Sequence, residues 1–582
     1  MKKIIYLLII ALSNFYIVAY SQTTVDNANY TNFKYLPQEK IYAHLNSTFL
    51  ITGDYLYYKV YCQNIETNNL SKISKIVYVE LIDTNKKIIF KHKLRLNDGL
   101  GQGDFFIPSS IPSGNYKLIA YTQWMRNVSE NSFFQNDIGI LNPFQLNQNQ
   151  IVDFTKLDSL KPLKVISNST TSSIRKNKNI LLELTSKKFK NREKVTLKLS
   201  SLKNNKSYGD YSISVRKIEN IGTPNRAMAS NYSPKYIHDV KSKPSIKNNS
   251  IYLPELRGEL ISGKIIVKET NKPIANINVA LSIPDKDFIL KISKTNKYGV
   301  FYFNIKEEYK NTDILIQLTD GHNDTFKIVV DEQTPINYSE LNFNTFRIPL
   351  KYHDSILKHS IYNQIENAYS SVKLNKYKPL TINEHFFIEE IDVDYFLDDY
   401  TRFPTLKETI VEVITPVWIS KKAGQYAFHV RSSNLESNFP PLLIVDGVFI
   451  SNHNELIDYD AKKIKRISIV RDNYIYGSKL FKGVISIETF NGNYKGGLLS
   501  IKWNKSKIDK VYYSQEYNNT DSINRIPDFR TQLLWLPDFK LDKKEKVITF
   551  FTSDNNGEYE ICLEGFTKEG KPVSLGEVFS VE

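Results

Sequence analysis

Short runs of alternating apolar and polar residues recur along most of the chain and predict β-strands. Near the N-terminus, turn-forming sequences rich in Asn, Asp, Gly and Pro separate such runs, which lie at 53–60, 76–82, 88–94 and 116–122. Short strands at near-regular spacing favour a β-sandwich. Similar runs at 180–184, 195–199 and 211–215 predict a second module of this kind.

One stretch, 354–371, has a helical period instead. Its apolar residues recur every three to four positions, which predicts an α-helix with an apolar face made of Ile356, Leu357, Ile361, Ile365 and Ala368. An acidic, aromatic run follows at 389–400, and Thr405 is then expected to be the N-cap of another helix.

The stretch from Pro441 to Asn493 has the most distinctive pattern. Two apolar runs, 442–445 and 448–450, are joined by Asp446-Gly447, and Asp-Gly tolerates the positive φ angles of a two-residue type I′ hairpin turn. A short polar helix is expected at 454–463. A strand at 464–470, a break at Tyr476-Gly477-Ser478 and a last strand at 483–489 complete a small α+β unit.

This order of elements resembles the plug domain of outer-membrane TonB-dependent receptors. The matched pieces are Val-Asp-Gly-Val at 445–448, the strand 464–472, Tyr476-Gly477 and the segment that begins at Gly483. The resemblance implies structural roles for Asp446, Gly447, Gly477 and Gly483, and a hairpin turn explains the Asp-Gly pair without any chemistry. The receptors continue into a barrel of about 22 strands. Fewer than a hundred residues follow Asn493 here, so we expect a plug-like domain without its own pore.

Two further resemblances concern the other modules. Pro37-Gln38-Glu39-Lys40-Ile41-Tyr42-Ala43-His44, followed by Gly53-Asp54-Tyr55-Leu56-Tyr57-Tyr58-Lys59, resembles the macroglobulin-type domain that opens many secreted Bacteroidetes proteins. The segment with Gly263, Lys272-Pro273-Ile274 and Thr295–Gly299 looks like the carboxypeptidase regulatory-like fold, a transthyretin-type β-sandwich. That fold is an accessory domain in the enzymes, so it implies a spacer or scaffold rather than peptidase activity.

The predicted architecture is mostly β, with several Ig-like or transthyretin-like β-sandwiches in tandem and one small α+β plug-like domain. The expected parts are a signal peptide (1–21), a macroglobulin-like sandwich (22–150), a second Ig-like module (165–250), a carboxypeptidase regulatory-like sandwich (251–350), a helix and acidic linker (351–400), the plug-like domain (401–495) and a C-terminal Ig-like module (496–582).

The N-terminal sequence, the net charge and the cysteines limit the expected location and partners of the protein. Lys2 and Lys3, the apolar run 4–12 and Ala19-Tyr20-Ser21 form a secretory signal, and no later segment is apolar enough to cross a membrane as a helix. The formal net charge is +15, but export and scattered lysines argue against a nucleic-acid partner. Cys62 and Cys562 are each expected to be buried, and neither lies in the reactive Cys-Gly-Glu-Gln sequence of macroglobulins.

Candidate chemistry is sparse. The acidic run 389–399 is the only dense carboxylate cluster, yet its spacing fits no calcium-loop template. His385 with Glu389 is too small a set for zinc, and Asp320–Asp324 is typical of a turn. Gly477-Ser478 lies in no Gly-x-Ser-x-Gly sequence, and no nucleotide-binding motif occurs. Tyr55, Tyr57 and Tyr58 would stack on sugar if exposed, but core packing is favoured. We therefore expect no catalytic, cofactor-binding or metal-binding residues.

Three functions remain open. The leading hypothesis is a non-enzymatic exported scaffold or accessory protein of the periplasm or outer membrane, whose plug-like domain binds another protein. The second is a regulatory subunit of a separately encoded TonB-dependent transport barrel. The third is a surface adhesin or glycan-binding protein. The oligomeric state is left open.

Overall fold

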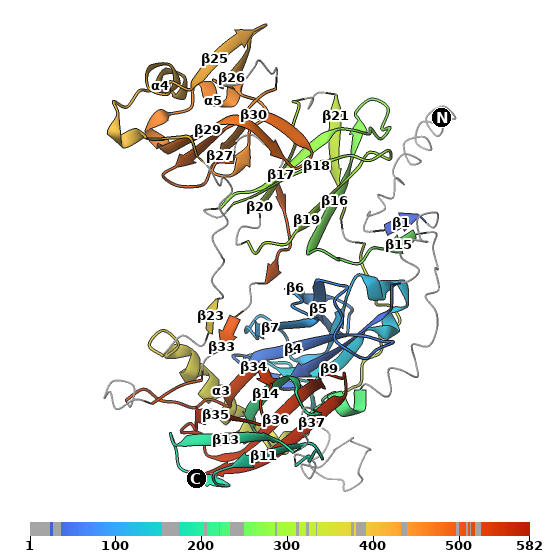
Figure 1. The fold of residues 1–582 in the computed structure, drawn as a ribbon. Helices are drawn as coiled ribbons and strands as arrows, with labels where there is room; N and C mark the ends of the chain where they lie inside the picture. Colours follow the sequence, from blue (N-terminus) through green and yellow to red (C-terminus); the bar gives the residue numbers. More distant parts are fainter. Residues whose placement is uncertain are drawn as a thin grey trace, which may run out of the picture. The chain divides into compact units, whose positions relative to one another are not determined.

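The computed structural model describes most of the chain and divides it into two compact units (Figure 1). Unit 1 contains Arg257–Pro335 and Ile382–Lys505, and unit 2 contains Asp26–Leu256, Ile336–Thr381 and Ser506–Glu582. The described residues are 24–26, 36–153, 174–202, 206–219, 221–232, 250–285, 288–309, 313–321, 325–332, 334–373, 377–379, 391–431, 439–495, 500–507, 510–512, 514–517 and 525–582. The predicted signal peptide (1–21), His385 and Glu389 lie outside them.

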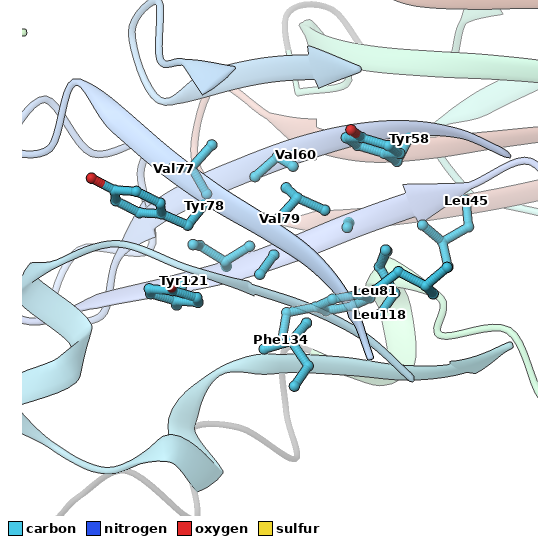
Figure 2. Close-up of a cluster of buried hydrophobic side chains, with 14 of the residues drawn as sticks. Leu45, Tyr58, Val60, Val77, Tyr78, Val79, Leu81, Leu118, Tyr121 and Phe134 are labelled. Carbon is cyan, nitrogen blue, oxygen red and sulfur yellow. The ribbon is translucent and has the colours of Figure 1, made fainter. Parts of the chain in front are cut away.

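Alternating strands near the N-terminus form the β-sandwich that the sequence predicts, in unit 2. One sheet has the order β2 (Glu39–Leu45), β4 (Tyr55–Asn64), β7 (Leu100–Phe106). The other has the order β3 (Phe49–Ile51), β9 (Phe134–Leu141), β8 (Gly114–Tyr121), β5 (Ile76–Asp83), β6 (Ile88–Arg95), β32 (Ser506–Lys507). Figure 2 shows side chains from both sheets meeting in the core, among them Leu45, Tyr58, Val79 and Leu118. Two 3-10 turns, η2 (Trp124–Asn127) and η3 (Glu130–Ser132), precede β9.

Unit 2 contains a second β-sandwich, whose strands come from two distant parts of the chain, and this differs from the predicted domain order. Its sheets are β11 (Ile180–Leu184), β13 (Lys194–Ser201), β35 (Glu545–Phe551) and β12 (Lys188–Phe189), β37 (Pro572–Val581), β36 (Gly557–Thr567), β14 (Gly209–Lys217), β34 (Gln532–Leu541). Strands from both segments predicted as separate Ig-like modules, β11 to β14 from 165–250 and β34 to β37 from 496–582, build this one domain. The physical reason is that neither segment has enough strands to cover its own apolar face, so β14 pairs with both β34 and β36.

The predicted helix is present as α3 (His353–Ala368), but it buries a different face. The buried residues are Ile356, His359, Ser360, Asn363 and Glu366, whereas Leu357 and Ile361 are exposed. This helix and the segment before it belong to unit 2, where β22 (Ile348–Pro349) pairs with β10 (Val152–Asp153). The remaining short elements of unit 2 are β15 (Ser250–Tyr252), η5 (Leu350–Tyr352), β23 (Tyr377–Pro379) and β33 (Lys510–Tyr512).

Unit 1 contains a smaller β-sandwich. Its two sheets are β19 (Val300–Ile305), β16 (Glu259–Val267), β21 (Phe326–Val330) and β18 (Ile289–Lys294), β17 (Asn278–Ile283), β20 (Asp313–Leu318), β31 (Ser500–Lys502). The predicted module 251–350 therefore ends too late, since residues 336–350 pack in unit 2.

The plug-like module, also in unit 1, is a five-stranded sheet in the order β24 (Val393–Phe396), β29 (Ile464–Tyr476), β30 (Lys479–Thr489), β27 (Leu442–Val445), β28 (Val448–Phe449). Its other elements are η6 (Leu397–Asp399), α4 (Leu406–Glu412), the hairpin β25 (Val417–Lys422) with β26 (Gln425–Val430), α5 (Asn454–Ile457) and η7 (Ala461–Lys463). The predicted N-cap is confirmed, because Thr405 forms a capping box with Glu408. Part of the predicted acidic linker is instead the edge strand β24.

No helix in the described part of the chain is both long and apolar enough to span a membrane.

Candidate functional site

The Asp446-Gly447 pair forms the two-residue turn between β27 and β28. Both residues have positive φ, +49° and +81°, as a type I′ turn requires. The Asp446 carboxylate accepts hydrogen bonds from the backbone N–H of Thr489 at 2.8 Å, from the Thr489 hydroxyl at 2.6 Å and from the Tyr494 N–H at 3.1 Å. These contacts tie the turn to the end of β30, so Asp446 has a structural role here.

The other two glycines of the plug motif lie on the β29–β30 hairpin. Gly477 begins the turn with φ +59°, and a Cβ there would lie 2.5 Å from the Ile292 carbonyl oxygen of the sandwich. Gly483 has φ +81°, and a Cβ there would lie 2.5 Å from the Val470 carbonyl oxygen of the neighbouring strand. Both positions require glycine for backbone conformation and for close approach.

One face of the plug-like sheet packs on the small sandwich of unit 1. The Phe449 N–H donates to the Ser282 hydroxyl at 3.1 Å, and the Ser451 hydroxyl donates to Gln317 Oε1 at 3.0 Å. Their shared apolar cluster is Ala280, Leu290, Ile292, Leu442, Ile444, Phe449, Val470, Phe481 and Val484. Asp446 and Gly447 lie near the end of β30 and Gly477 precedes its start, so the four motif residues are not gathered at one place, and each has a turn or packing role.

The outer part of this sheet, around β24, is exposed. Asp394 forms a bidentate ion pair with Arg466 at 2.6 and 2.9 Å. Burial alone would raise the pKa of the Asp394 carboxyl, but Arg466 outweighs this effect and the pKa is lowered. The Arg466 guanidinium lies 5.3 Å from the ring centre of Phe396, whose side chain is 46% exposed. No group of three or more potential metal ligands occurs among the described residues.

Unit 2 contains a cavity of about 90 Å³ where α3 meets both sandwiches. Three aromatic side chains lie in a row along it: the Tyr55 and Tyr57 rings are 5.6 Å apart, and those of Tyr57 and Trp535 are 5.7 Å apart. Tyr58, on the opposite face of β4, is fully buried in the core. The expectation of core packing is therefore confirmed for Tyr58, whereas Tyr55 and Tyr57 are half-buried.

The buried charges beside this cavity centre on Asp54. Its carboxylate accepts from His359 Nε2 and Asn363 Nδ2, both at 3.1 Å, and lies 3.3 Å from the Arg216 guanidinium. Glu219 lies against the other nitrogen of His359. Burial opposes the charge on His359, but Asp54 and Glu219 outweigh it and raise the pKa of the imidazole to about 10. His359 is therefore a buried cation at neutral pH.

The other charged residues that line the cavity are paired as well. Lys373 Nζ donates to Glu366 Oε1 at 2.6 Å, and Arg530 forms a bidentate pair with Asp528 at 2.7 Å. These paired charges and hydrogen bonds connect α3 to the strands and loops around the cavity. Sequence reasoning missed His359, Asn363 and Glu366, although their spacing also follows a helical period.

Both cysteines are buried in unit 2, as the sequence predicts. Burial raises the pKa of the Cys562 thiol to about 12, which makes it a poor nucleophile.

No family model and no curated protein matches the chain. Among solved structures it is similar to an α2-macroglobulin of Salmonella reacted with methylamine (9% identity, TM-score 0.23, 93% of this chain and 39% of that one). It is also similar to an Escherichia coli α2-macroglobulin activated by porcine elastase (9%, 0.23, 94% and 44%) and to latent PorU from Porphyromonas gingivalis (10%, 0.15, 54% and 34%). The chain spans less than half the length of these proteins, and TM-scores this low support no functional conclusion.

Proposed function

We propose that the protein is a non-enzymatic, exported scaffold or accessory protein of the periplasm or outer membrane, and that its plug-like module binds a protein partner. The observation that carries the proposal is the exposed edge of β24. In the described part of the chain, β24 pairs only with β29, so one side of it has no strand beside it. Such an edge is a template for a strand of another chain.

The backbone geometry of β24 suits strand addition. The Asp446 N–H donates to the Ile487 carbonyl, so the backbone groups of Ile487 face β27 and those of its partner Ile467 face β24. Tyr395 lies opposite Ile467 and is hydrogen-bonded to it, and the alternation of an antiparallel ladder then directs the N–H groups of Asp394 and Phe396 away from β29. Exposed apolar side chains flank the edge, namely Ile391, Phe396 and Tyr400. An extended segment with apolar side chains would find both backbone partners and side-chain contacts there.

The rest of the module favours this edge over its other surfaces. The opposite end of the sheet, at β27 and β28, is covered by the small sandwich. The second face of the sheet packs on α4, α5 and the β25–β26 hairpin. Among the residues that the structure describes, the β24 edge is therefore the part of the sheet that an extended partner reaches without displacing another segment.

Photo-crosslinking in cells tests the proposal. A photoreactive phenylalanine analogue at Phe396 should capture one protein of the cell envelope reproducibly, whereas the same analogue at Val547, an exposed position of unit 2, should not. Asp394→Pro should abolish the capture, because the lost N–H points away from β29. Asp394→Ala loses the ion pair with Arg466 but keeps the N–H, so it is the matched control and should keep the capture. Equal capture at both positions, or capture that survives Asp394→Pro, would contradict it.

The identity of the captured protein also separates the scaffold hypothesis from the transport-subunit hypothesis. An outer-membrane transport barrel would make this chain its regulatory subunit, whereas a periplasmic protein would favour the scaffold. Export is tested independently, since the secreted form should begin at Gln22 in mass spectrometry of its N-terminus.

A further inference from the structure

A second cavity lies in unit 2, away from the charged network around Asp54. Its volume is about 510 Å³, within the range of roughly 300–1,000 Å³ that is typical of small-ligand sites. Half of its twelve lining residues carry side-chain amides: Asn131, Gln135, Asn136, Asn225, Asn231 and Asn344.

The floor of the cavity is held by Asn136, which is buried. Its Nδ2 donates to the Asn225 carbonyl at 3.2 Å, and its Oδ1 accepts from the Ala227 N–H at 2.8 Å. The segment that follows β14 is thereby fixed against the start of β9. The Tyr42 hydroxyl donates to the Ala227 carbonyl at 3.2 Å from below. The segment after β14 and the start of β9, which line the cavity, are therefore held in place by hydrogen bonds before any ligand binds.

Both charged residues that line the cavity have a charged partner. Asp137 pairs with Lys117 at 2.6 Å, and Arg226 pairs at 2.9 Å with Glu560, which also pairs with Arg175 at 3.1 Å. A charged ligand would have to compete with these pairs. A ligand without charge has no such cost.

The remaining lining offers amides above an apolar floor. Asn131, Asn225, Asn231 and Asn344 are exposed at the rim. Asn344 Nδ2 donates to Asp137 Oδ2 at 2.5 Å, and Asn231 Oδ1 accepts from the Ser230 hydroxyl at 3.4 Å, but each side-chain amide has two N–H donors and two acceptor lone pairs. Phe133, Ala227, Met228 and Tyr232 supply the apolar surface. Hydroxyl groups likewise donate and accept, so a ring with hydroxyls on its edges and C–H groups on its faces matches this lining.

We propose that this amide-lined cavity binds a neutral sugar, of one or two residues by its volume. Its hydroxyl groups pair with the rim amides, and its apolar face packs on Met228 and Tyr232. The proposal concerns unit 2 and is independent of partner binding at the β24 edge of unit 1.

Ligand-observed NMR on the full secreted chain tests the proposal, with glucose, galactose, mannose, N-acetylglucosamine and their disaccharides as probes. At least one of these should bind with a dissociation constant below about 10 mM, where weak sites are measurable. Asn231→Ala and Gln135→Ala should each weaken binding about fivefold, the usual effect of one lost hydrogen bond. Asn149→Ala, an exposed asparagine of the same unit outside the cavity, is the matched control and should change nothing.

Each other outcome overturns the proposal. It fails if no probe sugar binds, or if the two cavity variants bind as the Asn149→Ala control does. It also fails if galacturonate or an uncharged alanine peptide binds more tightly than every neutral sugar, because the cavity would then be selective for charge or for a peptide backbone. Thermal denaturation of each variant separates lost binding from lost folding.

Discussion

The charge state of His359 is determined by the residues packed around it. His359 lies on α3 between Asp54 and Glu219, and the side chain is 4% exposed. Removing the imidazole would leave two buried carboxylates near each other with one cation fewer. Such a loss costs about 3 kcal/mol or more.

The charge state of His359 makes this cost depend on pH. Because the folded-state pKa is raised from 6.5 to about 10, the stability from its ion pairs is fully present below pH 6.5 and is lost as the pH rises toward 10. We expect His359→Gln to lower the free energy of unfolding by about 3 kcal/mol at pH 6 and by much less at pH 9.5. Urea denaturation at the two pH values measures this.

A histidine in unit 1 is the control for that measurement. His429 is half-buried and stacks on Trp418, and burial, with Lys482, lowers its pKa. His429→Gln should therefore show no larger effect at pH 6 than at pH 9.5. An equal loss at both pH values for His359→Gln would mean that the imidazole is neutral in the folded protein.

At the scale of the element, sequence patterns predicted local structure well and the buried side poorly. Thr405 and Glu408 have the spacing of a capping box, and α4 begins there. For α3 the period predicted the helix, but the apolar stripe at Leu357 and Ile361 is exposed. The polar face is buried because Asp54, Glu219 and Lys373 satisfy it. Asp54 and Glu219 are far away in the sequence, so periodicity contains no information about them, whereas Lys373 is only seven residues beyond Glu366.

The hairpin turn at Gly447 provides a test of how the plug-like sheet packs on its sandwich. A Cβ at Gly447 would lie 2.1 Å from the Phe288 side chain, whereas a Cβ at Gly424 would meet nothing within 4 Å. The two glycines have nearly the same φ, +81° and +79°, so backbone strain is matched. Gly424→Ala should cost about 1 kcal/mol, and Gly447→Ala about 3 kcal/mol because overpacking adds to the strain.

Chemical denaturation of both variants measures the difference. Equal costs would show that Phe288 moves aside freely, and the tight contact between the turn and the sandwich would then be absent in solution.

At the scale of the whole molecule, strands that are far apart along the chain pair within one domain. The sequence predicted the strands at 180–215 and at the C-terminus, and the fold class that they build is confirmed. It did not predict that β13 pairs with β35 and that β14 lies between β34 and β36. The alternation of side chains reports which face of a strand is buried, not which strand lies beside it. For the same reason the amide-lined cavity, whose walls come from residues 131–137, 225–232 and 344, was not visible in the sequence.

This pairing predicts the effect of a C-terminal deletion. A chain that stops at Asn524 loses β34 to β37, which leaves β14 without either neighbour and exposes Ile213, Val215 and Leu197. We expect residues 180–217 to become sensitive to protease, and the calorimetric transition that His359→Gln shifts to disappear. The transition that Gly447→Ala shifts should stay, because unit 1 contains none of the deleted residues. If 180–217 stayed resistant, these strands would fold without the C-terminal segment, and the two halves would be separate domains after all.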